Sequence, residues 1–429
     1  RPAGCSHAPL QKFPSWHTRV KRSAWGYRGV RRGSRDEAPA GKGIIVRTQS
    51  LGDQTVDLLG RLVRLGCVND LTADSGGEER AADLLEEFFA GLPVSIERIT
   101  PHPGRTSLVV TVEGADPRSA GTPLTLLGHT DVVPVDTAKW TRDPFGAQIE
   151  DDVMWGRGTV DMLHLTAAMA VVTREVARRA QDGNPLARSL VFVAAADEEA
   201  RGGLGVPWIG DNKPNALPWD AALSEMGGAH VRGRRGGDSV VVVVGEKGAA
   251  QRRLHIRGDA GHGSVPLGRM SAVERLAQVS AALSAARWPT ATDEVWAGFV
   301  RAFEFDETIE TSLINGTYEG DYSEFEDLAA FAHAISHVTV AQTVAHSGGP
   351  INVLPSHATL ELDIRTLPGV NDDDVDAAIA AALGDLAEHV TIERLLSEAA
   401  TASSIDTDLY RVIEAALTQR YPGTRVVPV

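Results

Sequence analysis

Two kinds of apolar segment alternate over the first 246 residues. Apolar side chains recur every three or four positions near 58–65, 79–92 and 161–180, which is typical of amphipathic helices. Short uninterrupted apolar runs, typical of strands buried on both faces, occur at 107–112, 123–127, 190–196, 221–223 and 240–244. This alternation predicts an α/β domain with a mostly parallel sheet and helices on both of its faces.

The pattern changes after Glu246. Four segments alternate apolar and polar residues like half-exposed strands, and two others have helical spacing. In chain order they are the strand 252–257, the helix 271–286, the strands 339–345 and 359–365, the helix 372–386 and the strand 390–395. This order is that of the ferredoxin-like split βαβ module. We therefore expect the first domain over 48–246, an inserted α+β domain over 247–396, and a return to the first domain over 397–429.

Composition narrows the class of protein further. The 429 residues are 43% hydrophobic, but no apolar run reaches the roughly 18 residues of a membrane span. Two cysteines, Cys5 and Cys67, exclude a disulfide scaffold. The net charge of −15 argues against nucleic acid as the main partner. We expect a cytoplasmic protein with neither a membrane nor a nucleic-acid partner.

The first 47 residues differ from the rest in charge. They contain 11 Lys and Arg but only 2 Asp and Glu, whereas the remainder contains 31 and 55. Three interpretations stay open: a disordered tail, a targeting or nucleic-acid arm, or translated sequence upstream of the true start. We favour the third, since the chain begins with Arg1 and the first periodic segment starts only near Ile44.

Residues that could bind a metal follow three of the predicted strands. His129 ends the second apolar run, Glu198 and Glu199 follow the run at 190–196, and Glu225 follows the run at 221–223. Ligands of open α/β sheets bind beyond the carboxyl ends of the strands. We expect these side chains to converge at one edge of the sheet.

Two further acids accompany these candidates. Asp131 is two residues from His129, so in an extended segment its carboxylate could hold the second ring nitrogen and orient the imidazole. For an isolated His-x-Asp pair, a hydrogen-bonded loop histidine and a capping Asp would be the simpler interpretation. Asp161 lies in the glycine-rich segment 156–162, where a helix-capping role is the alternative.

The adjacent acids Glu198 and Glu199 would point in opposite directions in an extended segment, so they would have different roles. One could bind a metal, and the other could act as a general base with a pKa raised by burial. Their alternative is a solvated turn. One imidazole and several carboxylates without a thiolate suit divalent ions such as zinc. Two ions bridged by a carboxylate and a water are a known means of amide hydrolysis.

Three segments carry a resemblance to a known family: 127–134 (LGHTDVVP), 156–162 (GRGTVDM) and 196–203 (ADEEARGG). They resemble the metal motifs of the co-catalytic zinc family of aminoacylases, glutamate carboxypeptidases, acetylornithine deacetylases and succinyl-diaminopimelate desuccinylases. The resemblance runs from about Val56 to the last residue. It implies that His129 and Glu225 bind one metal, Glu199 binds the other and Asp161 bridges the two.

The resemblance also implies roles for other residues. Glu198 would be the general base and Asp131 the residue that orients the metal-binding histidine. His262, in the segment 261–266 (GHGSVP), would reach across a dimer to polarise the scissile carbonyl, although a turn histidine is the alternative. Arg365 and Asn352 match the segment that grips a substrate carboxylate, and Arg365 could equally be a surface strand residue.

Two departures from the family pattern stand out. His164 follows Met162 where many members have Lys-Gly, and we interpret it as a helix residue. Family members also have a final metal-binding histidine beyond the point where this sequence stops, whereas the last histidine here is His389. We therefore expect a fragment cut at both ends, which binds one metal well and turns over poorly.

The resemblance implies a metal-dependent hydrolase, a metallopeptidase or amidohydrolase. It would cleave a peptide or N-acyl amide bond next to a free carboxylate, as carboxypeptidases, dipeptidases and aminoacylases do. Its cofactors would be two divalent metal ions, zinc or else cobalt or manganese. The substrate would be a small peptide or N-acyl amino acid, and the inserted domain would form a homodimer. Two alternatives stay open: a biosynthetic deacylase of the acetylornithine or succinyl-diaminopimelate type, and a truncated, non-catalytic dimer.

Overall fold

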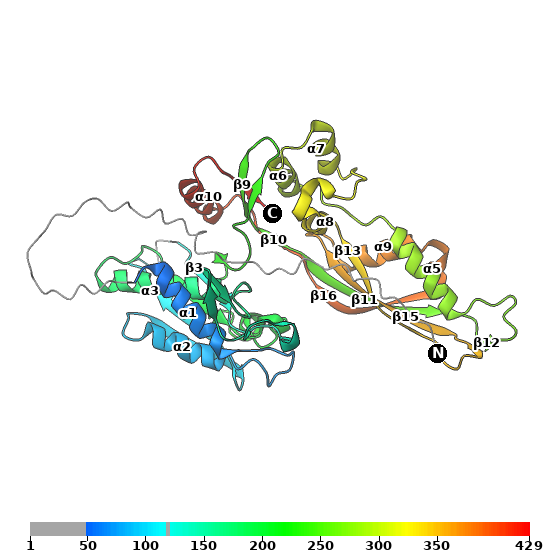
Figure 1. Cartoon of the computed structure of the whole chain (residues 1–429), viewed down its shortest axis with the longest axis horizontal. Coiled ribbons are helices and arrows are strands. Elements are labelled where there is room, and N and C mark those ends of the chain that lie inside the picture. The colour runs from blue at the N-terminus through cyan, green and yellow to red at the C-terminus, as the bar shows by residue number, and fades with distance from the viewer. Residues whose placement is uncertain (1–48, 117–120) are drawn as a thin grey trace, which may run out of the picture. The chain divides into compact units, whose positions relative to one another are not determined.

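The computed structural model describes residues 49–116 and 121–429, which form two compact units (Figure 1). The first unit ends at Glu225 and the second begins at Met226. The predicted basic leader over 1–47 lies outside the described residues. None of the described helices is both long and apolar enough to span a bilayer.

A five-stranded sheet forms the centre of the first unit. Its strands, in spatial order, are β1 (Ser95–His102), β2 (Arg105–Val112), β6 (Leu190–Ala195), β3 (Leu124–His129) and β7 (Ala222–Leu223). β6, β3 and β7 are parallel, whereas the hairpin of β1 and β2 adds antiparallel pairings at one edge. Four of these strands were predicted. β1 was missed because its side chains are mostly exposed or half-buried, so it lacks a continuous apolar run.

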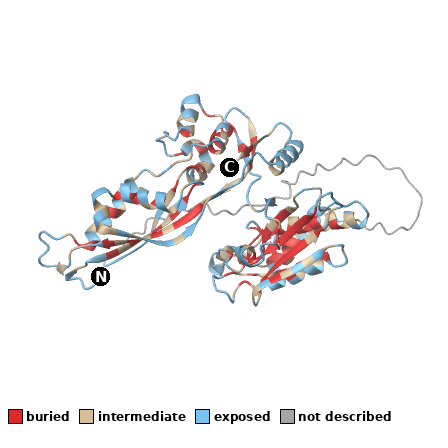
Figure 2. Ribbon diagram, turned by 180° about the vertical axis from the view of Figure 1, so that it is seen from behind, coloured by how far each residue is buried: buried red, intermediate tan, exposed pale blue. Residues whose placement is uncertain are grey.

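Helices cover both faces of this sheet, as predicted. Leu190, Phe192 and Ala194 of β6 pack with α1 (Leu51–Leu65), α2 (Glu79–Phe89) and α3 (Leu163–Gln181). The alternate residues Val191 and Val193 pack on the other face with α4 (Val206–Asn212). Since successive side chains of a strand point to opposite faces, a strand covered on both faces is apolar throughout. Figure 2 shows the buried residues concentrated in these strands.

The second unit contains a four-stranded antiparallel sheet. Its spatial order is β13 (Thr339–Ser347), β15 (His357–Thr366), β11 (Gly248–Arg257) and β16 (Val390–Glu398). The helices α5 (Ala272–Ala285) and α9 (Asp372–Leu383) share an apolar core with these strands. The order of the elements along the chain is the predicted ferredoxin-like one. The fully buried Arg252 joins β11 to α9 through ion pairs with Asp372 and Asp376.

A second, smaller sheet belongs to the same unit. It consists of β18 (Arg425–Pro428), β9 (Asp238–Val242) and β8 (His230–Arg232). An aromatic core, including Phe299 and Phe325, packs among α6 (Glu294–Ala302), α7 (Glu307–Ile314) and α8 (Ala329–Ser336). The apolar run at 240–244 was expected in the first sheet. It lies instead beside β18, because its parallel partner comes late in the chain.

The remaining elements are short or peripheral: β4 (Gln148–Glu150), β5 (Val153–Trp155), β10 (Gly245–Glu246), β12 (Gly261–His262), β14 (Val353–Leu354), β17 (Thr401–Ala402) and α10 (Asp408–Arg420). The boundaries predicted for the inserted domain, at 247 and 396, stay a prediction.

Candidate metal centre

His129 is the last residue of β3, and its backbone is held by pairing with β6 and by a hydrogen bond from α3. β3 runs between β6 and β7, with His129 beside Ala195. Its carbonyl accepts a hydrogen bond from the Thr166 hydroxyl of α3 at 2.8 Å. The side chain is 2% exposed. The imidazole is therefore held at the carboxyl end of the sheet.

The two ring nitrogens of His129 face different groups. Nδ1 lies 2.9 Å from the main-chain oxygen of Asp131, which can only accept a hydrogen bond. Nδ1 therefore carries a proton, and Nε2 is left to face the acids of the centre. The Asp131 carboxylate, predicted to orient this ring, is farther from Nδ1 at 3.4 Å.

Three acids from separate segments surround Nε2. It lies 3.3 Å from Asp161, 3.7 Å from Glu198 and 3.9 Å from Glu225. Among the described residues, one donor atom each from His129, Asp161 and Glu225 lie within 4.8 Å of one another. Asp161 comes from the turn before α3, and Glu225 follows β7. The structure thus brings together three of the four residues proposed from the sequence as metal ligands.

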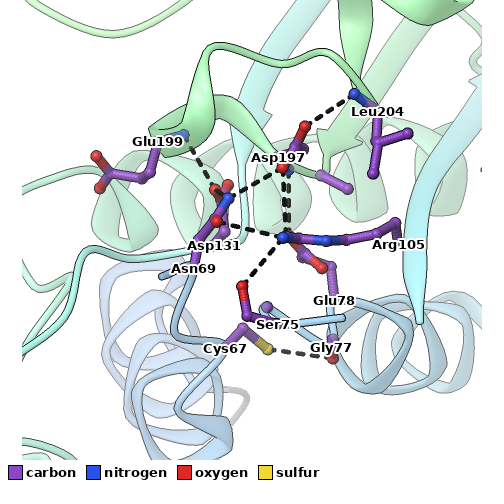
Figure 3. A network of polar contacts seen from close by, with 12 residues as sticks. Cys67, Asn69, Ser75, Gly77, Glu78, Arg105, Asp131, Asp197, Glu199 and Leu204 are labelled. Atoms are coloured by element: carbon purple, nitrogen blue, oxygen red, sulfur yellow. Dashed lines mark hydrogen bonds and ion pairs between the residues drawn. The ribbon is translucent and has the colours of Figure 1, made fainter. Parts of the chain in front are cut away.

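The fourth proposed ligand, Glu199, lies in the turn that follows β6, next to Glu198. Its backbone N–H faces Asp131, whereas its carboxylate points away from the buried side chains beneath (Figure 3). It is outside the group of three. Burial, followed by the negative charge of Asp161, raises the pKa of Glu199 to about 7.

The other groups of the centre titrate abnormally as well. Burial, opposed by His129 but reinforced by Asp161, raises the pKa of Glu225 to about 7. Burial by itself would lower the pKa of His129, yet its contacts with Asp131 and Asp161 raise it to about 11. Two causes therefore act at this centre: burial, which disfavours the charged forms, and an excess of carboxylates over cations. One imidazole with carboxylates, and no thiolate, fits a divalent ion such as zinc, cobalt or manganese.

A buried polar network adjoins the centre through Asp131 (Figure 3). Its members, which we call the Arg105 network, are Asn69, Glu78, Arg105, Asp131 and Asp197. Asp197 has a left-handed backbone (φ 67°), a conformation that costs a non-glycine residue about 1–2 kcal/mol. Its carboxylate accepts hydrogen bonds from Asn69 at 3.1 Å and from the Leu204 N–H at 2.8 Å, which offset this cost.

Sequence reasoning missed Asn69, Glu78 and Arg105. One signal was available, because Glu78 directly follows two glycines. At Gly76 (φ +80°), a Cβ atom would lie 2.2 Å from Arg105 Nη1, so the chain needs glycine there to make room for the network.

Comparison with known proteins identifies the family. The family model described as "Peptidase family M20/M25/M40" matches residues 125–429, which include all four proposed ligands. The chain belongs to this family. Its enzymes are metal-dependent, in agreement with the donor atoms gathered at His129.

Curated relatives of this M20 chain carry the names of two activities. The "Acetylornithine deacetylase" of Pectobacterium carotovorum subsp. carotovorum (strain PC1) is 25% identical over 307 residues, 72% of this chain and 66% of the relative. The "Probable carboxypeptidase S-like 2" of Dictyostelium discoideum is 27% identical over 334 residues, 75% of this chain and 62% of the relative. The chain thus spans slightly less than two thirds of the length of these relatives.

Solved structures confirm the M20 fold. The M20 family metallo-carboxypeptidase Sso-CP2 from Sulfolobus solfataricus has a TM-score of 0.60 and 19% identity, over 88% of this chain and 86% of that one. Human carnosine dipeptidase 1 has a TM-score of 0.55 and 15% identity, over 88% and 84%. The mixed α/β architecture derived above is that of this family.

The candidates in the second unit fall in two places. His262 in β12 pairs with Val353 in β14, and the Gly263 N–H donates to the carbonyl of Asn352 at 2.7 Å, which places His262 close to Asn352. Arg365 lies near the end of β15 with its side chain 47% exposed and ion-paired with Asp363 at 3.1 Å. In the first unit, His164 is half-buried at the start of α3 and is not among the grouped donors.

Metal binding by this centre should release protons and strengthen as the pH rises. With a pKa of about 11, His129 carries a proton at neutral pH that an ion must displace. Glu199 and Glu225 have pKa values of about 7, so below pH 7 they are mostly protonated and also lose protons when an ion binds. Well above pH 7 they are already ionised and release none. Zn²⁺ affinity should rise from about pH 6 to about pH 8, more steeply below pH 7 than above it.

Isothermal titration calorimetry in two buffers of different ionisation enthalpy measures both the affinity and the number of protons released. An affinity that stays constant or falls over this pH range would contradict the assignment of these groups.

Proposed function

We propose that this chain is a metal-dependent hydrolase that cleaves a peptide or N-acyl amide bond next to a free carboxylate. One observation carries the proposal: His129, Asp161 and Glu225 meet within 4.8 Å at the end of the sheet in a chain of the M20/M25/M40 family. The family indicates the type of chemistry, and the three grouped donors indicate where in this chain it would take place.

In this proposal the centre holds two divalent ions, zinc or else cobalt or manganese. His129 and Glu225 would hold one ion, Glu199 would hold the other, and Asp161 would contribute to both. The short separations of Asp161 and Glu225 from His129 Nε2, 3.3 Å and 3.9 Å, support this arrangement. Two bound ions would lower the pKa of the attacking water and polarise the scissile carbonyl.

Glu198 serves as the general base. Its carboxylate lies 3.7 Å from His129 Nε2, so it is within the centre yet outside the group of three donors. A carboxylate in this position accepts the proton of the attacking water and returns it to the leaving amine. Asp131 holds the His129 ring through its main-chain carbonyl.

The second unit supplies substrate contacts in this proposal. His262 of the partner subunit would donate a hydrogen bond to the oxygen that becomes negative as the water attacks. Arg365 binds the free carboxylate of the substrate with its planar fork, and Asn352 adds an amide contact. The exposure of the Arg365 side chain supports its availability for a ligand.

A homodimer through the second unit completes the proposal. Among the described strands β13 pairs only with β15, so its other edge is unpaired. A groove of about 460 Å³ adjoins it, lined by Leu276, Ala277, Val344 and other residues of α5 and β13. Two copies that joined these edges antiparallel would extend the sheet and cover the apolar side chains. The cytoplasmic location stays a prediction.

Acetylornithine deacetylases among the curated relatives favour one alternative, a deacylase for a single biosynthetic substrate. That enzyme would use the same centre and differ only in the side chain it accepts.

Replacement of Glu198 by Gln should lower kcat by about 10²–10⁴-fold, because the amide cannot accept the proton of the attacking water. Metal content, measured by inorganic mass spectrometry, should not change. Glu86→Gln, an exposed site on α2 of the same unit, is the control and should keep full activity. Undiminished turnover of Glu198→Gln would refute its role as base.

Substrates with a free carboxylate should be cleaved about 10- to 100-fold better in kcat/KM than their amidated forms, since a hydrogen bond to a charged group contributes about 1.5–3 kcal/mol. A panel of dipeptides, N-acetyl and N-succinyl amino acids tests this and separates the alternatives. Activity confined to N-acetylornithine would favour the dedicated deacylase. Equal cleavage of amidated substrates would contradict the proposed carboxylate site.

Replacement of Val344 by Lys should convert a dimer into a monomer, because it places a charge in the apolar groove beside the β13 edge. The control is Leu395→Lys on β16, the opposite edge strand, where the native side chain is similarly exposed (39% against 36%). Light scattering after size-exclusion chromatography measures the mass. A Val344→Lys variant that remains dimeric would place the interface elsewhere.

A further inference from the structure

The turn that carries Glu198 and Glu199 is held by side chains at each backbone N–H from residue 196 to residue 199. The four hydrogen bonds run from Ala196 to Ser107 Oγ (3.0 Å), from Asp197 to Glu78 Oε1 (3.2 Å), from Glu198 to Asp131 Oδ1 (3.2 Å) and from Glu199 to Asp131 Oδ2 (3.0 Å). We call these three side chains the turn cradle. Ser107, Glu78 and Asp131 are each 0% exposed.

Two of these side chains are carboxylates, which accept stronger hydrogen bonds from N–H groups than neutral acceptors do. Asp131 has a second contact, since its main-chain oxygen binds His129 Nδ1 at 2.9 Å. The main-chain carbonyl of Asp131 therefore orients the His129 ring, and its carboxylate holds the turn that carries the two glutamates. Any displacement of Asp131 moves both parts of the metal centre together.

Arg105 and Asn69 contact the two acids of the cradle (Figure 3). Arg105 Nη1 lies 2.6 Å from Glu78 Oε1 and 3.4 Å from Asp197 Oδ1, and the arginine is fully buried. Asn69 Nδ2 donates to Asp131 at 2.9 Å and to Asp197 at 3.1 Å. Arg105 is thus the one cation in a network with three buried carboxylates. Since buried carboxylates repel one another, the network depends on this positive charge and on the donors around it.

We infer that Arg105 and Asn69 are positioning residues for the metal centre. Neither is among the donors grouped around His129, and both act through the turn cradle, which holds the backbone of Glu198 and Glu199. The inference rests on the proposed function, because it explains how the backbone that carries the proposed base and the proposed metal ligand is held in place. It adds two residues to those assigned from the sequence.

The test compares three variants. Asn69→Ala removes the amide that joins Asp131 to Asp197, and Arg105→Lys keeps the charge but removes the planar fork. Arg252→Lys is the matched control, since Arg252 is also fully buried and also paired with two carboxylates, but in the second unit. Both Arg→Lys variants should lose thermal stability.

Three readouts separate positioning from stability alone. In Asn69→Ala and Arg105→Lys, amide hydrogens of residues 196–199 should exchange faster in the metal-free protein. Zn²⁺ affinity should fall about 10- to 100-fold, the usual effect of losing a partner behind a ligand. With the ions saturating, kcat should fall while KM stays within about twofold, because the substrate contacts are untouched. Arg252→Lys should show none of these three changes.

Unchanged exchange at 196–199 and unchanged Zn²⁺ affinity in Asn69→Ala would overturn the inference, even if the wild type hydrolyses amides as proposed. A wild type that binds Zn²⁺ but cleaves no amide would refute the proposed function, while exchange and affinity would still decide the positioning role. If Arg105→Lys does not fold, Asn69→Ala decides by itself, because it leaves every charge of the network in place.

Discussion

Negative charge gathered around a single imidazole is the constraint on which the rest of this structure depends. Asp161, Glu198 and Glu225 all lie within 4 Å of His129 Nε2, and Asp131 is buried next to it. Carboxylates at such separations repel one another unless cations or protons compensate them. Burial raises the pKa of Glu199 and of Glu225 to about 7, and repulsion from Asp161 contributes to both shifts. Bound divalent cations would compensate the negative charge of these carboxylates and so reduce the repulsion between them.

The sheet makes this concentration of charge possible. The parallel strands β3, β6 and β7 deliver His129, the two adjacent glutamates and Glu225 at the same edge. Apolar packing on both faces stabilises these strands. This burial offsets the unfavourable free energy of grouping the acids at one edge. Beneath the edge, Arg105 supplies the one positive charge of the buried network, and Asp131 transmits the order of that network to His129.

The sequence predicted what depends on local pattern. Uninterrupted apolar runs predicted four strands of the first sheet, and the residues directly after them predicted where ligands would gather. Arg105 could not be predicted in this way, because its partners Asn69 and Glu78 come from separate segments and an arginine at the start of a strand is usually exposed. The edge strand β1 lacks a continuous apolar run, and the helices α6 to α8, of nine, eight and eight residues, are too short for an apolar period to be sustained. The hydrogen bond from His129 to the main chain of Asp131, rather than to its carboxylate, depends on backbone geometry that no residue type encodes.

The most direct test of the central claim is anomalous X-ray diffraction at the zinc absorption edge, from crystals of the protein grown with Zn²⁺. The account predicts a strong anomalous peak in bonding contact with His129 Nε2 and the carboxylates of Asp161 and Glu225. Crystals that show no anomalous peak at these three residues, or a peak only elsewhere on the molecule, would contradict it.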